Sequence, residues 1–469
     1  MQFLRGLTTA EWVCAWGTQL AFWHASPPIR DRWVWLLLLP VLFWSVRWLV
    51  TRRAALPPVL AVITLSFLAL SAYNYEAAPL RRADYWVLVC RPLAGLWLIA
   101  ATVQLVWHEQ RLRWPLAALG ALAVVGLTLG LFATQWSSKS AALDPITRAL
   151  PRLDHRAFLP DAQLSFNPNE IAGALALLCP LMFGLAYRQR GRVRWALAAV
   201  GVGLLGALLL GQSRFALAGV IVSLGVWVFF SLHGGARRTG VLALAALIAL
   251  EAAIVSAVPR GDSGSNGASP LAQRDIDSLQ HRVDMIERSL QMLIDHPLTG
   301  VGMSMYRTAI RQPAYQIPAF EAQNFTAPHA HNLWAQMAAD MGIPGLLWYG
   351  TLHAWFVWML RRIAQRGDRG LAAALGAAFL SYSIYGLGDA ITLWDRLGFV
   401  WWVLFAAAAA GCDVQNIGYN TSVEASLGEK RAVSEADVSI NTQASASLGH
   451  DRAACWSCTA PQQRPTTPV

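Results

Sequence analysis

Charged residues are scarce in this sequence. Asp, Glu, Lys and Arg make up 14% of the 469 residues, and hydrophobic residues make up 55%, whereas about 25% of the residues of a soluble domain are charged. This composition excludes an ordinary water-soluble globular protein. It indicates a chain that lies largely within a membrane.

Cysteine is scarce as well, and the positions of the cysteines exclude a disulfide framework. Three of the six lie in apolar runs, and three lie at or beyond the last such run: Cys14, Cys90 and Cys179, then Cys412, Cys455 and Cys458. None falls in a loop that we expect to be exported, where disulfides would form. We interpret the Cys-Trp-Ser-Cys spacing near the end of the chain as incidental.

Three further features are missing. The N-terminal stretch does not resemble a removable signal peptide, because Glu11 interrupts its apolar core and no convincing small-residue cleavage site follows. The chain shows no internal repeat and no paired Gly- or Pro-broken spans of the kind that builds transporters from inverted halves. Its basic residues are scattered arginines, so the net charge of +10 does not form a nucleic-acid-binding patch. We expect the first apolar run to be retained.

Apolar runs long enough to span about 30 Å of hydrocarbon recur along the chain. They predict an all-α, polytopic integral membrane protein with about twelve transmembrane helices. The runs cover about 9–24, 33–50, 57–75, 84–107, 115–135, 168–187, 194–211, 215–232, 240–257, 333–360, 371–388 and 396–411.

Arginine is concentrated in alternate connections, which indicates the cytoplasmic side. The short loops after runs 2, 4, 6, 8 and 10 hold fourteen arginines: Arg52, Arg53, Arg111, Arg113, Arg188, Arg190, Arg192, Arg194, Arg237, Arg238, Arg361, Arg362, Arg366 and Arg369. The short opposite loops hold fewer: Arg30, Arg32, Arg81, Arg82 and Arg214. Both termini are therefore predicted to be cytoplasmic.

This topology divides the chain into six segments. Residues 1–135 form the first five helices, 136–167 an exported loop, and 168–257 helices six to nine. Residues 258–332 form a large exported loop, 333–411 the last three helices, and 412–469 a polar tail that we expect to be disordered in the cytoplasm.

The large exported loop contains an amphipathic helix. Apolar residues recur at three- and four-residue spacing, at Ile276, Leu279, Val283, Ile286, Leu290 and Leu293. This apolar stripe is expected to lie on the membrane surface or to roof a cavity. Asp275 and Asp277 have the spacing of a metal-binding pair, but we interpret them as acidic residues that favour a helix start.

A candidate site follows this loop, where His329, His331 and Asn332 precede the apolar run at 333–360. A neutral histidine can act as a general base, and a helix N-terminus disfavours its protonated form and attracts anions. Three arginines are predicted on the same face: Arg214, Arg282 and Arg288. A base beside phosphate-binding cations suits a diphosphate-linked lipid substrate and needs no metal. The alternatives are that the histidines are interfacial, that Arg214 snorkels to lipid, and that Arg282 and Arg288 are solvated.

Four stretches resemble the O-antigen ligase and polymerase superfamily. One begins at His331-Asn332 and continues with nine residues, Gly342, two residues and Gly345; the others are FNPNEIAGALALL, GQSRFALAG and HPLTGVGMSMY. The resemblance covers roughly 160–350 well and the rest by topology alone.

The resemblance implies a metal-independent, inverting glycosyltransferase without a cofactor, in the inner membrane of a Gram-negative bacterium with its site facing the periplasm. The ligase branch transfers O-antigen from undecaprenyl diphosphate to lipid A-core. By this likeness, His331 matches the general base, and Arg214 and Arg282 match diphosphate-binding residues. Arg288 and Asp389 are suggested by position, Asn332 is a supporting residue, and His329 lies outside the shared pattern.

Other functions remain open at this point. A repeat-unit polymerase or a protein O-oligosaccharyltransferase of the same superfamily would use the same site with a different acceptor. We favour the ligase because the His-Asn spacing and the single dominant exported loop are as expected for that branch. A different class, a lipid-linked glycan flippase or transporter, is disfavoured by the absence of repeats and by the polar groups at one membrane face.

Overall fold

The structure is a computed structural model. It describes residues 2–24, 34–51, 56–109, 112–136, 143–151, 166–232, 234–256, 270–318, 327, 329–395 and 397–412. The chain divides into two units, Met1–Gln415 and Asn416–Val469. The second unit lies outside the described residues, so the predicted disordered tail stays a prediction.

The described chain is helical, as the apolar runs predict. Its helices are α1 (Gln2–His24), η1 (Val34–Leu37), α3 (Leu38–Thr51), α4 (Pro58–Ala77), α5 (Tyr85–Glu109), α6 (Arg113–Phe132), α7 (Asp144–Ala149), α8 (Pro168–Arg188), α9 (Gly191–Gly211), α10 (Arg214–Ser231), α11 (Gly234–Ser256), α12 (Pro270–Asp295), α13 (Tyr306–Ala309), α15 (Leu333–Gln365) and α16 (Arg369–Tyr385). A last helix covers Phe399–Cys412. Among the described residues, the only β feature is an isolated bridge between Thr134 and Phe166.

Six of the described helices are long and apolar enough to cross a membrane. They are Pro58–Ala77, Tyr85–His108, Arg113–Phe132, Pro168–Arg188, Gly191–Gly211 and Arg214–Ser231. The all-α, multi-pass membrane architecture is therefore confirmed. Each of the twelve predicted runs overlaps a described helix. The count of twelve spans stays a prediction, because six of the described helices have the length and hydropathy of a membrane span.

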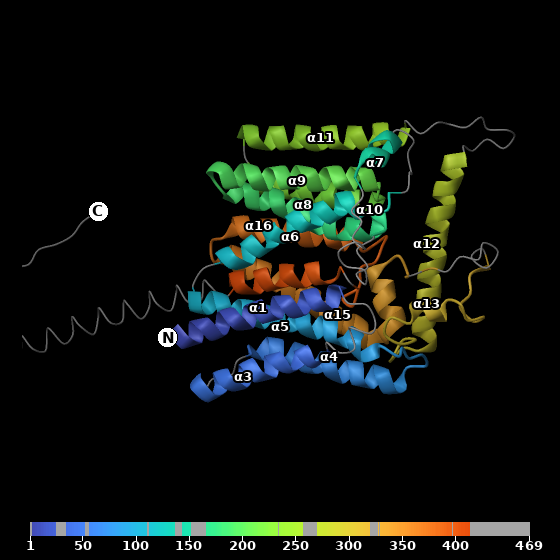
Figure 1. Cartoon of the computed structure of the whole chain (residues 1–469). Coiled ribbons are helices and arrows are strands. Elements are labelled where there is room, and N and C mark those ends of the chain that lie inside the picture. Colours follow the sequence, from blue (N-terminus) through green and yellow to red (C-terminus); the bar gives the residue numbers. More distant parts are fainter. Residues whose placement is uncertain are drawn as a thin grey trace, which may run out of the picture. The chain divides into compact units, whose positions relative to one another are not determined.

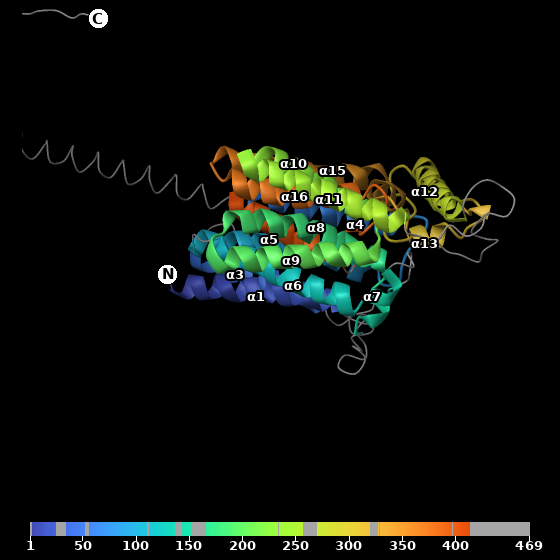
Figure 2. The same ribbon diagram turned by 90° about the horizontal axis from the view of Figure 1, so that it is seen from above.

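The apolar helices run side by side, and α8 lies at their centre (Figures 1 and 2). Almost every residue of α8 from Ile171 to Ala186 is buried, and it contacts α6, α9, α10 and α16. Glycines permit two close approaches to α16: a Cβ on Gly184 of α8 would lie 2.5 Å from that of Ala374, and one on Gly219 of α10 would lie 2.4 Å from the Ser381 carbonyl. Small residues at such contacts are typical of helices that pack within a membrane.

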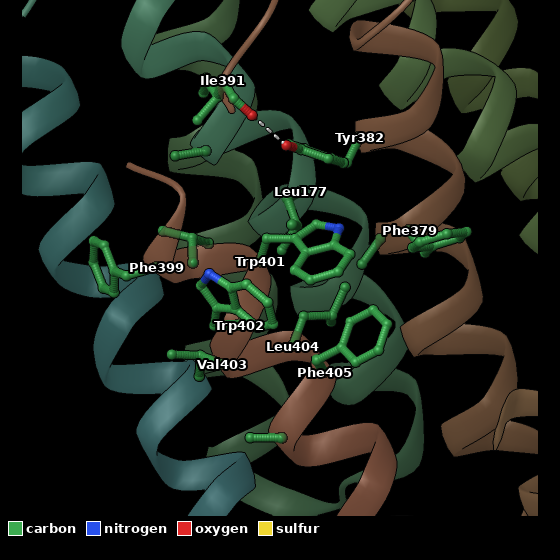
Figure 3. Packing of buried hydrophobic residues seen from close by; sticks show 14 of the residues in the cluster. Leu177, Phe379, Tyr382, Ile391, Phe399, Trp401, Trp402, Val403, Leu404 and Phe405 are labelled. Carbon is green, nitrogen blue, oxygen red and sulfur yellow. Dashed lines mark hydrogen bonds between the residues drawn. The ribbon is translucent and has the colours of Figure 1, made fainter. Parts of the chain in front are cut away.

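The last helix fills the space between α5, α8 and α16. Figure 3 shows Trp401, Trp402 and Phe405 from this helix beside Leu177 of α8 and Phe379 of α16. The Tyr382 hydroxyl donates a 2.6 Å hydrogen bond to the Ile391 carbonyl. This contact ties α16 to the segment that follows it, which carries Asp389.

Glu11, the charge inside the first apolar run, is buried and paired. Its carboxylate lies 2.5 Å from the Arg47 guanidinium of α3, and the Trp44 indole N–H donates to it at 3.0 Å. An intramembrane charge is tolerated when an opposite charge and hydrogen bonds satisfy it. Here the pair joins α1 to α3.

The large loop forms a second, smaller core at one end of the apolar helices, where α12 runs across their direction (Figure 1). Met285 and Met292 of α12 pack with Val301, Tyr306 and other buried residues of the loop and with the start of α15. The Asn74 side chain of α4 donates to the Thr299 carbonyl at 2.6 Å and accepts from the Met303 N–H at 3.1 Å. The loop is therefore fixed to the helix bundle.

The predicted amphipathic helix forms as α12, but its buried face differs from the predicted stripe. Met285, Ser289 and Met292 are buried, whereas Val283 and Leu290 are 42% and 47% exposed. The helix turns this way because both methionines reach the second core beside Tyr306. The outward residues leave an apolar strip, which agrees with the expectation of a membrane-surface contact. The side chains of Ile276, Leu279, Asp275 and Asp277 lie outside the described residues.

Helix α15 is broken at Gly342, the first glycine of the His-Asn motif. Gly342 has φ 65° and ψ −161°, a conformation that is essentially restricted to glycine. A Cβ there would lie 2.5 Å from the Pro297 carbonyl. The Val301 N–H donates to the Ala339 carbonyl at 2.7 Å and the Ile343 N–H donates to Pro297 at 2.8 Å. The break therefore lets the loop after α12 dock against the start of α15.

Candidate functional site

Two histidines and one carboxylate meet just before α15. The Asp389 Oδ1 atom lies 3.4 Å from His329 Nε2 and 3.5 Å from His331 Nδ1, and the two imidazole centroids are 4.2 Å apart. Asp389 is buried, and its Oδ1 also accepts from the Ala390 N–H at 2.9 Å. The carboxylate is thus held between the two imidazoles.

The turn that carries Asp389 accepts hydrogen bonds from three residues of two other elements. The Leu333 N–H donates to the Gly386 carbonyl at 2.7 Å, the Asn332 amide donates to the Leu387 carbonyl at 3.1 Å, and the Arg282 Nε–H donates to the Gly388 carbonyl at 3.2 Å. Three consecutive carbonyls are satisfied in this way. The position of Asp389 is therefore fixed by the start of α15 and by α12.

Asn332, predicted as a supporting residue, is the N-cap of α15. Its side-chain oxygen accepts the Ala335 N–H at 3.0 Å, which satisfies one of the free N–H groups of the first helical turn. Because its amide also holds Leu387, the side chain joins the helix that follows His331 to the turn that precedes Asp389.

Arg282 reaches this cluster from α12. Its guanidinium lies 5.6 Å from the centroid of the Phe215 ring, and Phe215 packs against Gly388, where a Cβ would lie 2.1 Å from the ring. Burial lowers the pKa of Arg282, Asp389 acts in the opposite direction, and the nearby Arg214 lowers it further. Arg282 is therefore near enough to both Asp389 and Arg214 to interact with their charges.

Arg214 is the first residue of α10, and its side chain is exposed. It lies beside Phe215, which forms the bridge to Arg282 and Gly388. Two neighbouring guanidinium groups repel one another, and an anion between them relieves this repulsion. The pair thus forms a cationic neighbour to the histidines.

Burial and charge set the protonation of two members of the cluster. Burial lowers the pKa of His329 to about 4; Asp389 opposes this shift, and His331 and Arg282 add to it. Burial alone would raise the pKa of Asp389, but the neighbouring imidazoles of His331 and His329 and the Ala390 N–H lower it below its usual range. At neutral pH, His329 is neutral and Asp389 is a carboxylate.

Of the predicted site residues, the structure brings His331, Asn332, Asp389, Arg282 and Arg214 together. Arg288 is the exception: its guanidinium donates to Gln291 on its own helix at 2.9 Å. Within the described part of the chain, no contact joins Arg288 to the cluster. Six residues along a helix turn the side chain about 120° away from that of Arg282, so a shared role for Arg288 stays a prediction.

A buried hydrogen-bond network fixes the segment that carries the two histidines. The Ala330 N–H donates to Gln336 Oε1 at 2.7 Å, the Gln336 amide donates to Asp340 Oδ2 at 2.8 Å, and the Tyr306 N–H donates to Asp340 Oδ1 at 3.1 Å. Asp340, a carboxylate inside an apolar run, therefore links the segment to the loop 296–306. Gln336 and Asp340 are one helical turn apart, and this spacing is the signal that could have found them.

The sequence places His329 beside His331 in the candidate site, but it gives His329 no role, because the superfamily pattern begins at His331. The available signal was the His-x-His spacing. In a segment that is neither helix nor strand, two histidines with this spacing can both reach the same third residue. The facing atoms of His329, His331 and Asp389 lie within 4.8 Å of one another, so the three could also hold a metal ion. Two arginines nearby disfavour a cation at this position.

Chemically, the cluster combines two imidazoles, a carboxylate and two guanidinium groups, which are the groups that can exchange a proton and bind an anion. Residues 199–350 match the family model described as O-antigen ligase. In a comparison with curated proteins, no sequence matches. The matched segment contains Arg214, Arg282, Arg288 and both histidines, whereas Asp389 lies beyond it. The resemblance inferred from the motifs is therefore confirmed.

Proposed function

Because residues 199–350 support membership of the O-antigen ligase and polymerase superfamily, we propose that the chain is an O-antigen ligase. It transfers O-antigen from undecaprenyl diphosphate to a hydroxyl of lipid A-core. The transfer inverts the anomeric configuration, uses no metal, and takes place at the periplasmic face of the inner membrane, with both termini of the chain in the cytoplasm.

The single observation that carries this proposal is the approach of His331 to Asp389, 3.5 Å from Nδ1 to Oδ1, beside Arg282 and Arg214. A carboxylate at Nδ1 favours the tautomer that carries its proton there, which leaves Nε2 to accept a proton. The arginines supply positive charge where a departing diphosphate would need it.

The proposed reaction follows from these positions. His331 Nε2 removes the proton of the acceptor hydroxyl while the oxygen attacks the anomeric carbon of the donor sugar. The bond from that carbon to the diphosphate oxygen breaks on the opposite side, so the configuration inverts. The bond electrons leave with the lipid diphosphate, and Arg282 and Arg214 stabilise its charge.

The orientation rests on the arginine distribution. The short connections assigned to the cytoplasm hold fourteen arginines and the short opposite connections hold five. The residues of the cluster all fall on the opposite face: Arg214 after the seventh run, the loop before the tenth, and Asp389 after the eleventh. The exposed apolar residues Val283 and Leu290 on α12 suit a site at the lipid surface, where a polyprenyl donor and a lipid acceptor are both found.

Mass spectrometry of lipopolysaccharide from a strain that lacks this chain tests the choice within the superfamily. Loss of all polymer from the core, with lipid-linked chains retained, supports the ligase. Core that bears a single repeat unit indicates a polymerase, and normal lipopolysaccharide with unglycosylated protein indicates a protein O-oligosaccharyltransferase. Transfer by the purified protein in detergent, without an ion gradient, would exclude a flippase or transporter.

The roles within the site are tested with purified protein and an undecaprenyl-diphosphate-linked donor. His331→Ala should abolish transfer but leave donor binding nearly unchanged, because a neutral imidazole adds little to diphosphate affinity. Arg214→Ala should weaken both binding and turnover. EDTA should have no effect. Full activity of folded His331→Ala would refute the general base, and loss in EDTA that a divalent metal restores would refute the metal-independent mechanism.

A further inference from the structure

We propose that His329 is a positioning residue that sets both the backbone of His331 and the carboxylate of Asp389. This inference rests on the proposed transferase function and assigns a task to a residue outside the superfamily pattern. His329 itself does not exchange the proton of the reaction.

The backbone of His331 is in an unusual conformation. Its φ is +50°, in the left-handed region that residues with a side chain rarely adopt. Among the described non-glycine residues, Gln212 and Ser304 share a positive φ. Such a conformation costs of order 1 kcal/mol or more and persists when neighbouring contacts enforce it.

His329 supplies a contact that enforces it. The His331 N–H donates to His329 Nδ1 at 3.2 Å. Because Nδ1 accepts this hydrogen bond, the proton of the neutral ring lies on Nε2. The tautomer of His329 is therefore determined by the backbone of the residue that it positions.

The other nitrogen of the same ring faces Asp389. His329 Nε2 lies 3.4 Å from Asp389 Oδ1, and in this tautomer Nε2 carries the ring proton. The oxygen is the one that lies 3.5 Å from His331 Nδ1. One imidazole thus connects the backbone of His331 to the carboxylate that its side chain faces.

This arrangement divides the work between the two histidines. In His329, Nδ1 accepts the His331 N–H and Nε2 carries the ring proton beside Asp389, whereas the described residues give His331 Nε2 no hydrogen-bond partner. A ring with both nitrogens occupied cannot receive the proton of an acceptor hydroxyl. His329 therefore fixes the position of the His331 imidazole relative to the Asp389 carboxylate. Its loss should slow the chemical step rather than weaken donor binding.

Two amide substitutions at position 329 each keep one of the two contacts of His329, with the His331 N–H or with Asp389, and remove the other. In His329→Asn, the side-chain oxygen takes the place of Nδ1 and can still accept the His331 N–H. In His329→Gln, the amide nitrogen takes the place of Nε2 and can still donate to Asp389. His329→Ala removes both contacts, and His281→Gln on α12 is the matched control.

The experiment measures kcat, donor KM and donor Kd for transfer from undecaprenyl-diphosphate-linked glycan by purified full-length protein. We expect kcat to fall about 10²-fold in His329→Ala and about 10-fold in each amide variant, with donor Kd unchanged within about threefold. In the Asp389→Asn background, His329→Asn should have little further effect, because both changes interrupt the contact between residue 329 and residue 389. His281→Gln should behave as wild type.

The outcomes separate this proposal from the function on which it rests. If the wild type transfers glycan and folded His329→Ala or either amide variant keeps its kcat, the positioning role is refuted and the transferase function stands. If donor Kd rises as much as kcat falls, His329 binds substrate instead. If EDTA removes wild-type activity and Zn²⁺ restores it, His329 is a metal ligand. Absence of any wild-type transfer would refute both proposals.

Discussion

Arg282 should serve two purposes, and replacing it separates them. The Nε–H of Arg282 holds the Gly388 carbonyl at 3.2 Å, and the charge of its guanidinium interacts with those of Asp389 and Arg214. A lysine keeps the charge but lacks the planar fork, so it cannot hold the turn and contact a diphosphate at once. Arg282→Ala removes both functions.

The size of the effect follows from these contacts. Loss of one charged donor to a departing oxyanion costs about 3 kcal/mol, or roughly 10²-fold in kcat/KM. Loss of the hydrogen bond to Gly388 costs about 1.5–3 kcal/mol of local stability, and loss of the contact with Phe215 costs about 0.5–2 kcal/mol. We expect Arg282→Ala to lose at least about 10²-fold in kcat/KM, and Arg282→Lys about 10-fold.

The assay is glycan transfer by protein in lipid nanodiscs, with donor Kd and a thermal melt measured on the same preparation. Arg307→Ala, an exposed arginine on α13, is the control and should match the wild type. The reasoning fails if Arg282→Lys is fully active, or if Arg282→Ala loses less than about threefold in kcat/KM while its melting temperature is unchanged.

Four further predictions follow. Reporters that are active only in the periplasm should work when fused at residue 265 and fail at 190, 365 and 420; activity at 190 or 365 would reverse the topology. A chain truncated after residue 415 should insert and transfer normally, since the remainder is polar and is predicted on the other side of the membrane; an inserted but inactive truncation would contradict this. Gly342→Ala should lower the melting temperature by several degrees, because its Cβ would lie 2.5 Å from the Pro297 carbonyl; an unchanged melt would show that the break in α15 can relax. Because the pKa of His329 falls from 6.5 to about 4 on folding, the unfolded state binds more protons, and up to about 3 kcal/mol of stability should be lost as the pH falls from 6.5 toward 4. His329→Gln should reduce this pH dependence of the melt, and an equal dependence in both proteins would contradict the assignment.

The helices and the main cluster could be predicted from the sequence because their signals are local. Apolar runs predicted the helices, and apolar residues at three- and four-residue spacing on both sides of Arg282 predicted α12. Arginine binds anions and histidine accepts protons, so Arg214, Arg282 and His331 indicated a site that binds an anion and transfers a proton. The concentration of arginine in alternate loops predicted that these three residues share one face of the membrane. Asp389 was predicted from its position alone, and the structure places it against His331.

The rest depends on contacts between distant parts of the chain. Nothing near residue 386 in the sequence indicates that three successive carbonyls accept hydrogen bonds from Leu333, Asn332 and Arg282. The buried face of α12 was misplaced because it is set by the docking of Met285 and Met292 against Tyr306. The role of His329 depends on the backbone angle of His331, which no spacing pattern encodes.

The hydrogen bonds that fix the turn at Gly386–Asp389 have a consequence for the biogenesis of the protein. Its partners come from α12 and from the start of α15, and Asp389 itself follows α16, so the site takes parts from helices that leave the ribosome at very different times. A chain that has inserted only as far as α12 already carries Arg214 and Arg282 but has neither histidine nor carboxylate. Under the proposed function, transfer can therefore begin only when synthesis is nearly finished, and a half-inserted chain would leave the lipid-linked donor unused.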